Sequence, residues 1–250
     1  MAKPERKRRR RLRKGLSFFW AALSVIAAAA AVILASTIFF KTGAITVTGT
    51  LKLDHAAVIE ASGLKTGGNL FLTKTDKAVQ NIKELFPYAQ EVSIKRQLPD
   101  TLVIEIDEAA PIAHIEHEGK VWLISHTGKL LEEVDYSAAQ GFGVNGCALD
   151  SPAEGKNIAS AINADPSARS LVKLMEALWN ENALGLVNGI DVSKSYEIVF
   201  RYDGRFDVDI GTLDDLEYKI SYFLGIVESL SGQDKGTIDV SSSPGRFIPA

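Results

Sequence analysis

The sequence predicts an α+β protein in which a single transmembrane helix precedes two small exterior domains. Three features of the chain support this fold class. Residues 16–40 form an unbroken run without a charged side chain, residues 45–107 show strand and helix patterns in the order β-α-α-β-β, and the remainder combines short alternating strands with two amphipathic helices. A sheet needs a helical cover, so the second domain is expected to hold a multi-stranded, mainly antiparallel sheet backed by helices.

The apolar run at residues 16–40 is long enough to cross a bilayer. As a helix its 25 residues span about 37 Å, against a hydrocarbon layer of ~30 Å. Nine Lys or Arg lie between residues 3 and 14, whereas Lys41 alone follows the run directly. Basic flanks stay in the cytoplasm, so we predict a cytoplasmic tail over residues 1–15, a transmembrane helix over residues 16–40 and an exterior remainder.

A cleaved signal peptide is the alternative interpretation of this run. Its apolar segment is normally ~7–15 residues long, which is shorter than the run seen here. Ala35-Ser36-Thr37 is also a poor cleavage site, and two bulky phenylalanines follow it. The pattern therefore favours an uncleaved anchor. A mature chain beginning near residue 37 would instead indicate a secreted transport or chaperone module.

Charge and cysteine content exclude several classes of protein. The formal net charge is −3; the tail, with nine basic residues and Glu5, contributes +8, which leaves −11 for the rest. An acidic exterior argues against a nucleic acid as the main ligand, and a basic tail beside a membrane span is better explained by topology and anionic lipid. The single cysteine, Cys147, cannot form an internal disulfide, and it is expected to be a small buried residue.

The first exterior domain begins with a short strand at residues 45–49, where apolar and polar residues alternate and the last residue is a glycine. Asp54 is expected to cap a helix over residues 55–62, which Gly63 closes. Gly67-Gly68 marks a turn. A phosphate-binding loop would need a strand, a GxxxxGK sequence and a helix around this glycine pair, and that context is absent from the sequence.

A second helix and a hairpin complete the pattern of this domain. The helix is expected to begin near Thr75 and to stop at Pro87. Its predicted apolar face comprises Val79, Ile82, Leu85 and Phe86. The hairpin joins a strand at residues 91–97 to a strand at residues 101–107 through a Leu98-Pro99-Asp100 turn.

Several segments of this domain have sequence patterns that are typical of one known family. They are residues 45–49, 67–71, 86–89, 92–102 and 108–113, the last with Ala109 where the family usually has Arg. In these segments, and in the order of basic tail, single span and first domain, the chain resembles the FtsQ/DivIB cell-division proteins. The resemblance implies a POTRA domain over residues 41–110 and a β domain over residues 111–250.

The second domain opens with a predicted hairpin of residues 121–125 and 129–134 around a Thr127-Gly128 turn. Residues 137–160 are rich in Ala, Ser and Gly and are assigned no element. Asp165-Pro166 then has the residue types that cap and open a helix, and Gly185 is expected to end it. The predicted buried stripe of this helix is Leu171, Leu174, Met175 and Leu178.

A second hairpin is predicted from two alternating patterns, one at Tyr196, Ile198 and Phe200 and one at Phe206, Val208 and Ile210. A two-residue loop would oppose Phe200 to Asp207 and mix the two faces. A three-residue loop at residues 202–204 instead pairs Phe200 with Phe206 and places Gly204 in the left-handed conformation. We predict this second register.

The chain is predicted to end with a helix and one strand. Thr212 is expected to cap the helix and Gly232 to close it. Its predicted inner face comprises Leu216, Ile220, Phe223, Val227 and Leu230. Residues 237–240 form the predicted last strand. The progression from residue 196 to residue 240 resembles the β domain of the FtsQ/DivIB family.

The sequence indicates no catalytic, cofactor-binding or metal site. His114 and His117 have a spacing that suits metal ligands on a helix, but in a strand-like segment an odd separation directs them to opposite faces. Motifs of serine hydrolases, penicillin-binding enzymes and zinc proteases are absent from the sequence. We therefore predict that the protein is not an enzyme, and the alternative of a membrane-anchored cell-wall enzyme would require turnover of peptidoglycan or its lipid-linked precursor.

The family resemblance implies a scaffold at the division septum of the bacterial cell membrane. Its implied partners are membrane proteins of the FtsB/DivIC and FtsL type, and through them the septal peptidoglycan synthases. An exposed sheet edge offers unpaired backbone groups to a partner strand, and the family implies that the C-terminal strand is this edge. The predicted partner-binding residues are Thr237, Ile238, Asp239, Val240, Arg246 and Phe247.

Overall fold

The computed structural model describes residues 19–31, 39–50, 52–160, 165–242 and 244–250. Residues 19–31 are helical. Among the described residues, no helix is both long enough and apolar enough to cross a membrane. The predicted tail and parts of the predicted span, residues 16–18 and 32–38, lie outside the described residues.

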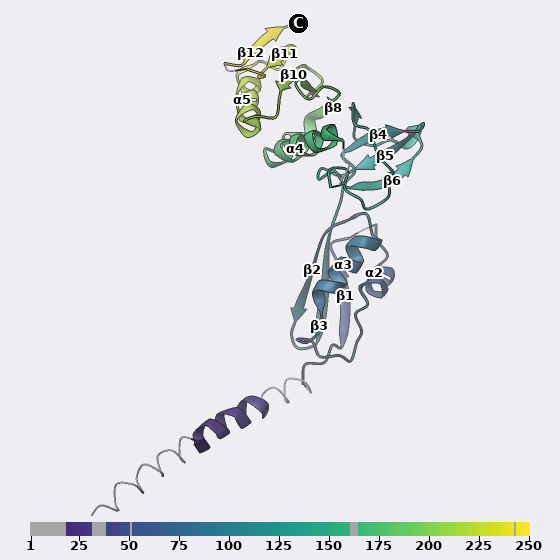
Figure 1. Ribbon diagram of the computed structural model, residues 1–250, viewed down its shortest axis with the longest axis vertical. Helices are drawn as coiled ribbons and strands as arrows, with labels where there is room; N and C mark the ends of the chain where they lie inside the picture. Colours follow the sequence, from purple (N-terminus) through teal and green to yellow (C-terminus); the bar gives the residue numbers. More distant parts are fainter. Residues whose placement is uncertain (1–18, 32–38, 51, 161–164, 243) are drawn as a thin grey trace, which may run out of the picture. The chain divides into compact units, whose positions relative to one another are not determined.

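The described chain divides into two compact units (Figure 1). The first unit contains residues up to 48 together with residues 54–79 and 93–105, and the second contains residues 49–53, 80–92 and 106–250. Domain boundaries at residues 110 and 111 stay a prediction, because this division follows the packing of segments and not their order in the chain.

The first five elements follow the predicted β-α-α-β-β order. They are β1 (Ala44–Thr48), α2 (His55–Ser62), α3 (Thr75–Leu85), β2 (Ala89–Gln97) and β3 (Thr101–Glu108). The strands form a three-stranded sheet in the order β1-β3-β2, with β1 parallel to β3. A short turn joins β2 to β3. Parallel strands need a long crossover connection, and here α2, α3 and β2 lie between β1 and its parallel partner β3 in the chain.

Local capping signals fix the first helix at the predicted residues. The side chain of Asp54 accepts a hydrogen bond from the backbone N–H of Ala56 at 3.2 Å. Gly63 has a φ of +66° and its N–H donates to the carbonyl of Glu60. At each end of α2, a residue that the sequence identifies directly therefore pairs one backbone group of the terminal turn.

The predicted apolar face of α3 is correct inside the helix and wrong at its end. Ile82 is fully buried and Ala78 is 2% exposed. Leu85, the last residue of α3, is 64% exposed. Periodicity predicts the direction in which a side chain projects from a helix. Whether a side chain at the helix end is buried depends on which other segments pack against it.

Nine strands of the described residues form one mixed sheet. They are β4 (Ala113–His117), β5 (Lys120–Ile124), β6 (Leu130–Val134), β7 (Phe142–Asn145), β8 (Val187–Asp191), β9 (Ile198–Tyr202), β10 (Phe206–Gly211), β11 (Gly236–Asp239) and β12 (Arg246–Pro249). Their order is β12-β11-β10-β9-β8-β7-β4-β5-β6, and antiparallel pairs outnumber parallel ones. The α+β class and the predicted β5–β6 hairpin are confirmed, and β7 lies in the segment for which no element was predicted.

Two helices, α4 (Pro166–Asn180) and α5 (Leu216–Ser229), pack against this sheet and share its main core (Figure 1). Asp165 caps α4 as predicted, because its side chain accepts from the N–H of Ser167 at 3.0 Å. The predicted end at Gly185 is wrong. Asn182, with a φ of +57°, already takes the left-handed conformation that ends the helix, and Asn tolerates this conformation better than most residues.

The predicted start of α5 is also wrong. Thr212 does not cap the helix, since its hydroxyl donates to the carboxylate of Asp214 at 2.9 Å and the N-cap is Asp215. The ammonium of Lys219 donates to the carbonyls of Ile210 and Thr212, which holds the segment after β10 as a loop. The predicted inner face is correct at Ile220 and Phe223, which are fully buried, and the other three positions are partly buried. The helix ends at Ser229, before Gly232.

The predicted β9–β10 register is wrong by two residues, although the buried faces are correct. Tyr202 pairs with Phe206, and Phe200 pairs with Val208. The three-residue loop is therefore Asp203–Arg205, in which Asp203 and Gly204 both have positive φ. Tyr202 remains in the strand because its ring packs on Phe223 of α5, with ring centroids 4.9 Å apart.

His126, in the turn between β5 and β6, stacks on Trp179 of α4. Their ring centroids are 4.1 Å apart and the ring planes differ by 12°. Burial lowers the pKa of His126 below its ordinary value, while Glu176 and Asp107 act in the opposite direction. The folded protein therefore favours the neutral imidazole at this position.

We expect the free energy of unfolding to decrease as the pH falls through about 6.5, the ordinary His pKa, because the unfolded state then binds a proton that the folded state resists. Denaturant titrations between about pH 5.5 and about pH 7.5 measure this slope. His126→Phe keeps an aromatic ring against Trp179 and removes the titration, so this variant should show a flatter profile. An unchanged slope in the variant would contradict the assignment.

Candidate functional site at the C-terminal sheet edge

The predicted partner-binding strand is not the edge of the sheet. β11 pairs with β10 on one side, in parallel, and with β12 on the other side, antiparallel. The backbone of residues 236–239 therefore has a neighbouring strand paired with it on both sides. Ile238 is fully buried and Val240 is 3% exposed, whereas Thr237 and Asp239 are half-buried. The prediction that residues 237–240 offer an open backbone edge is wrong.

The edge strand is β12, which contains the other two predicted residues, Arg246 and Phe247. It is the last strand of the sheet among the residues that the structure describes, and its label stands beside the C-terminus in Figure 1. A signal for β12 was present in the sequence. A run of small and turn-forming residues at 241–245 separates the pattern of β11 from the apolar pair Phe247-Ile248, as it does in a hairpin.

Side-chain contacts hold β12 against the sheet. The ring of Phe247 packs edge-on against Phe206 of β10, with centroids 6.0 Å apart. The guanidinium of Arg246 donates to the carboxylate of Asp239, the residue opposite it on β11, at 3.1 Å. The hydroxyl of Ser241 also donates to this carboxylate, at 2.6 Å. These two donors, Ser241 first and Arg246 after it, keep the pKa of Asp239 below its ordinary value.

The hydrogen-bond phase of β12 determines which backbone groups face outward. The N–H of Ala250 donates to the carbonyl of Lys235 at 2.9 Å, and pairing continues antiparallel from there. Since inward and outward bonding alternate in an antiparallel pair, Ile248 and Arg246 point their backbone groups toward β11. Phe247 then directs both its N–H and its C=O away from the sheet. Pro249 has the same phase but lacks an N–H, as is typical of edge strands.

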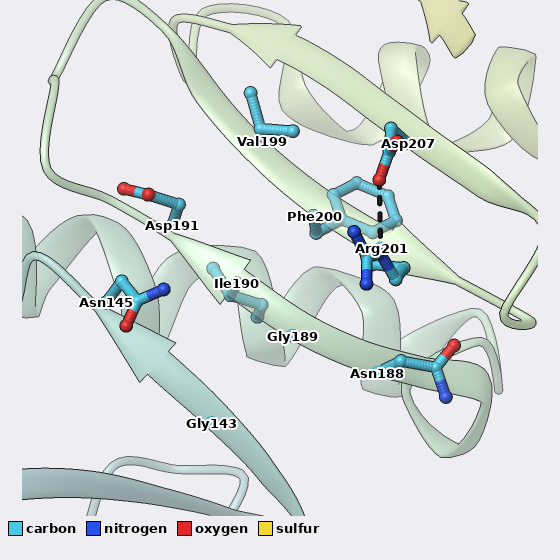
Figure 2. Close-up of a pocket in the computed structure, with 10 residues that line it drawn as sticks. All are labelled: Gly143, Asn145, Asn188, Gly189, Ile190, Asp191, Val199, Phe200, Arg201 and Asp207. Atoms are coloured by element: carbon cyan, nitrogen blue, oxygen red, sulfur yellow. Dashed lines mark hydrogen bonds and ion pairs between the residues drawn. The ribbon is translucent and has the colours of Figure 1, made fainter. Parts of the chain in front are cut away.

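The open face of the sheet carries a shallow polar hollow of about 370 Å³. Figure 2 shows Gly143 and Gly189, which are paired on neighbouring strands and line the hollow, and Asn145 on the same strand as Gly143. The guanidinium of Arg201 and the carboxylate of Asp207, which also line the hollow, form an ion pair at 3.3 Å. The lining residues offer amide and ion-pair contacts, without a nucleophile next to a general base.

The remaining candidate groups are placed by the structure as follows. Nδ1 of His114 lies 3.1 Å from the carbonyl oxygen of Gln140. Within the described residues, no three His, Cys, Asp or Glu side chains gather where they could hold a metal ion. Cys147 is buried, as predicted, and burial raises the pKa of its thiol to about 11, so the thiol is protonated at neutral pH.

Comparison with known proteins shows that the chain is similar to cell-division proteins. Residues 40–109 match the POTRA domain, FtsQ-type. The chain is 27% identical over 246 residues to the cell division protein DivIB of Clostridium botulinum strain Hall, covering 94% of this chain and 90% of that protein. It is 38% identical over 89 residues to the cell division protein FtsQ of Corynebacterium glutamicum, covering 36% of this chain and 40% of that protein.

A solved structure is also similar in part. It is the major extracytoplasmic domain of DivIB from Geobacillus stearothermophilus, with 14% sequence identity and a TM-score of 0.32. The match covers 52% of this chain and 99% of that one.

Proposed function

We propose, because the chain belongs to the FtsQ/DivIB family of cell-division proteins, that it is a membrane-anchored, non-catalytic scaffold of the division septum. Its anchor is the apolar run at residues 16–40, with the basic tail in the cytoplasm and residues 41–250 outside. Its partners are membrane proteins of the FtsB/DivIC and FtsL type, through which it influences septal peptidoglycan synthesis.

The observation that supports this proposal is the edge strand β12. A partner strand that pairs with β12 would receive a hydrogen bond from the N–H of Phe247 and donate one to its C=O. Arg246 and Ile248, which project from the same face of β12, flank this backbone, and Ile248 is 45% exposed. Arg and large apolar residues are suited to anchor a partner beside a strand-to-strand contact. We therefore assign partner docking to β12 in place of the predicted strand at residues 237–240.

The test compares Phe247→Pro with Phe247→Ala in the full chain. Both variants lose the ring that packs on Phe206, but only proline removes the outward N–H, and proline is tolerated at this phase of an edge strand. We expect the proline variant to bind the FtsB/DivIC-type protein of the same organism up to about tenfold more weakly than the alanine variant, since a net hydrogen bond contributes about 0.5–1.5 kcal/mol. Co-purification and titration of the two membrane proteins measure this difference.

Deletion of β12 is a poorer test, because it would turn β11 into a new edge. Leu186→Ala, at an exposed residue of the same unit away from β12, serves as the binding control. Equal affinity of the Phe247→Pro and Phe247→Ala variants would contradict strand pairing at β12.

A further inference from the structure

One end of the first unit exposes large apolar side chains. We call Phe39, Phe71, Leu72 and Leu98 the apolar tip. Their exposed fractions are 78%, 50%, 74% and 59%. A single exposed apolar side chain is ordinary, whereas large apolar side chains exposed together mark interaction surfaces.

Hydrogen bonds hold the apolar tip together. The N–H of Leu70 donates to the carbonyl of Phe40 at 2.9 Å, and the rings of Phe40 and Phe71 meet edge-on with centroids 5.3 Å apart. The N–H of Gly43 donates to the carbonyl of Asp100 at 2.7 Å, which places the β2–β3 turn, with Leu98, at the same end. The tip therefore consists of three chain segments, and one of them continues directly from the apolar run.

In the loop that presents Phe71 and Leu72, the backbone N–H groups and two of the carbonyls are paired inside the first unit. The side-chain oxygen of Asn69 accepts from the N–H groups of Phe71 and Leu72 at 2.9 and 3.0 Å. The guanidinium of Arg96 donates to the carbonyls of Leu70 and Thr73 at 2.9 and 3.2 Å. A loop enters a layer with little water more readily when its backbone groups are already paired, and the N–H groups of Leu70 to Thr73 are all paired here.

From these contacts we infer that the apolar tip inserts into the headgroup and upper acyl region of the bilayer that holds the anchor. This inference rests on the proposed anchoring through residues 16–40. Aromatic and aliphatic side chains with nearby lysines suit this region of a membrane, and Lys41 and Lys74 are exposed beside the tip. A bilayer is the favoured occupant over a protein because Phe39 and Phe40 are the last residues of the apolar run itself.

Insertion would attach the first unit to the membrane at two further points besides the anchor. Phe71 and Leu72 lie on one loop and Leu98 on another, and both loops are joined to the segment that leaves the apolar run. The first unit would then be held against the bilayer and could not rotate freely about residue 40.

A depth-resolved labelling experiment on the full chain tests this inference. The protein carries Cys147→Ala, is reconstituted into vesicles of phosphatidylethanolamine and phosphatidylglycerol, and receives an environment-sensitive fluorophore at one new cysteine. Leu72→Cys reports the tip and Val25→Cys reports the anchor. Ala56→Cys is the matched control, since Ala56 is exposed in the first turn of α2, which follows the opposite end of β1.

We expect the label at residue 72 to emit at shorter wavelength than the label at residue 56, and to be quenched by lipids with a nitroxide near the headgroup. Quenching at residue 25 without quenching at residue 72 overturns the inference and leaves the anchor intact. Protection of residue 72 from a water-soluble quencher without lipid quenching assigns the tip to a protein contact and also overturns it. An unquenched label at residue 25 refutes the proposed anchoring, and the inference with it.

Discussion

Phe223→Ala is expected to lower the free energy of unfolding of the second unit by about 3–5 kcal/mol. Phe223 is fully buried on α5 and meets two aromatic rings of β9 edge-on. The centroid distances are 5.3 Å to Phe200 and 4.9 Å to Tyr202. Truncation leaves a cavity between helix and sheet and removes both ring contacts, which add about 0.5–1.5 kcal/mol each to the burial of the ring.

Denaturant unfolding of the full chain in detergent, followed by near-ultraviolet circular dichroism, measures this loss. Tyr218→Ala is the matched control, because Tyr218 is on the same helix, 60% exposed and stacked on Tyr222. It should cost less than about 1 kcal/mol, as is usual for exposed side chains. Equal losses in the two variants would mean that α5 does not depend on its contact with β9.

Gly236→Ala is expected to detach β12 and to reduce partner binding more strongly than any exposed substitution in the second unit. Gly236 has a φ of +151°, and a Cβ at this position would overlap the carbonyl oxygen of Ile248 on β12. Adopting such a backbone conformation with a side chain costs about 1–3 kcal/mol, and relief of the overlap requires β12 to move away from β11. The edge proposed to bind the partner would then be lost while the rest of the sheet remains paired.

Hydrogen exchange at the N–H of Ala250, which bonds to Lys235, reports the detachment directly. Gly232→Ala is the matched control, since a Cβ there would meet no atom within 4 Å. The Gly236 variant should lose protection at Ala250 and affinity for the FtsB/DivIC-type protein, whereas the Gly232 variant should keep both. Retained binding with a detached β12 would contradict docking at β12 and would leave the newly opened edge of β11, or another surface, as the contact.

Features that depend on a few neighbouring residues were predictable from the sequence. Asp54 and Gly63 bound α2, and Asp165 caps α4, because each satisfies backbone groups at most three residues away. The alternation around Phe200 and Val208 identifies the buried face of β9 and β10, since side chains alternate along any strand. The fold class and the family resemblance follow from the accumulation of such local patterns.

Features that depend on distant residues were not predictable in the same way. The β9–β10 register is shifted because Tyr202 packs on Phe223, a residue of a helix that comes later in the chain. The edge strand is β12 and not the predicted β11, because Phe247 packs on Phe206 and Arg246 bonds to Asp239. In each case the local pattern is compatible with two arrangements, and tertiary contacts decide between them.

By itself the sequence determined the charge asymmetry, the apolar run, the order of the elements and their buried faces, since these follow from residue type and from spacing along the chain. Only the tertiary structure decided which strand ends the sheet, which backbone groups face outward there, and that Phe71, Leu72 and Leu98 gather at one end of the first unit. The physical reason is that a sheet edge or a surface cluster depends on how segments far apart in the chain pack together. The free energy of that packing selects one arrangement, and it cannot be inferred from a local sequence pattern.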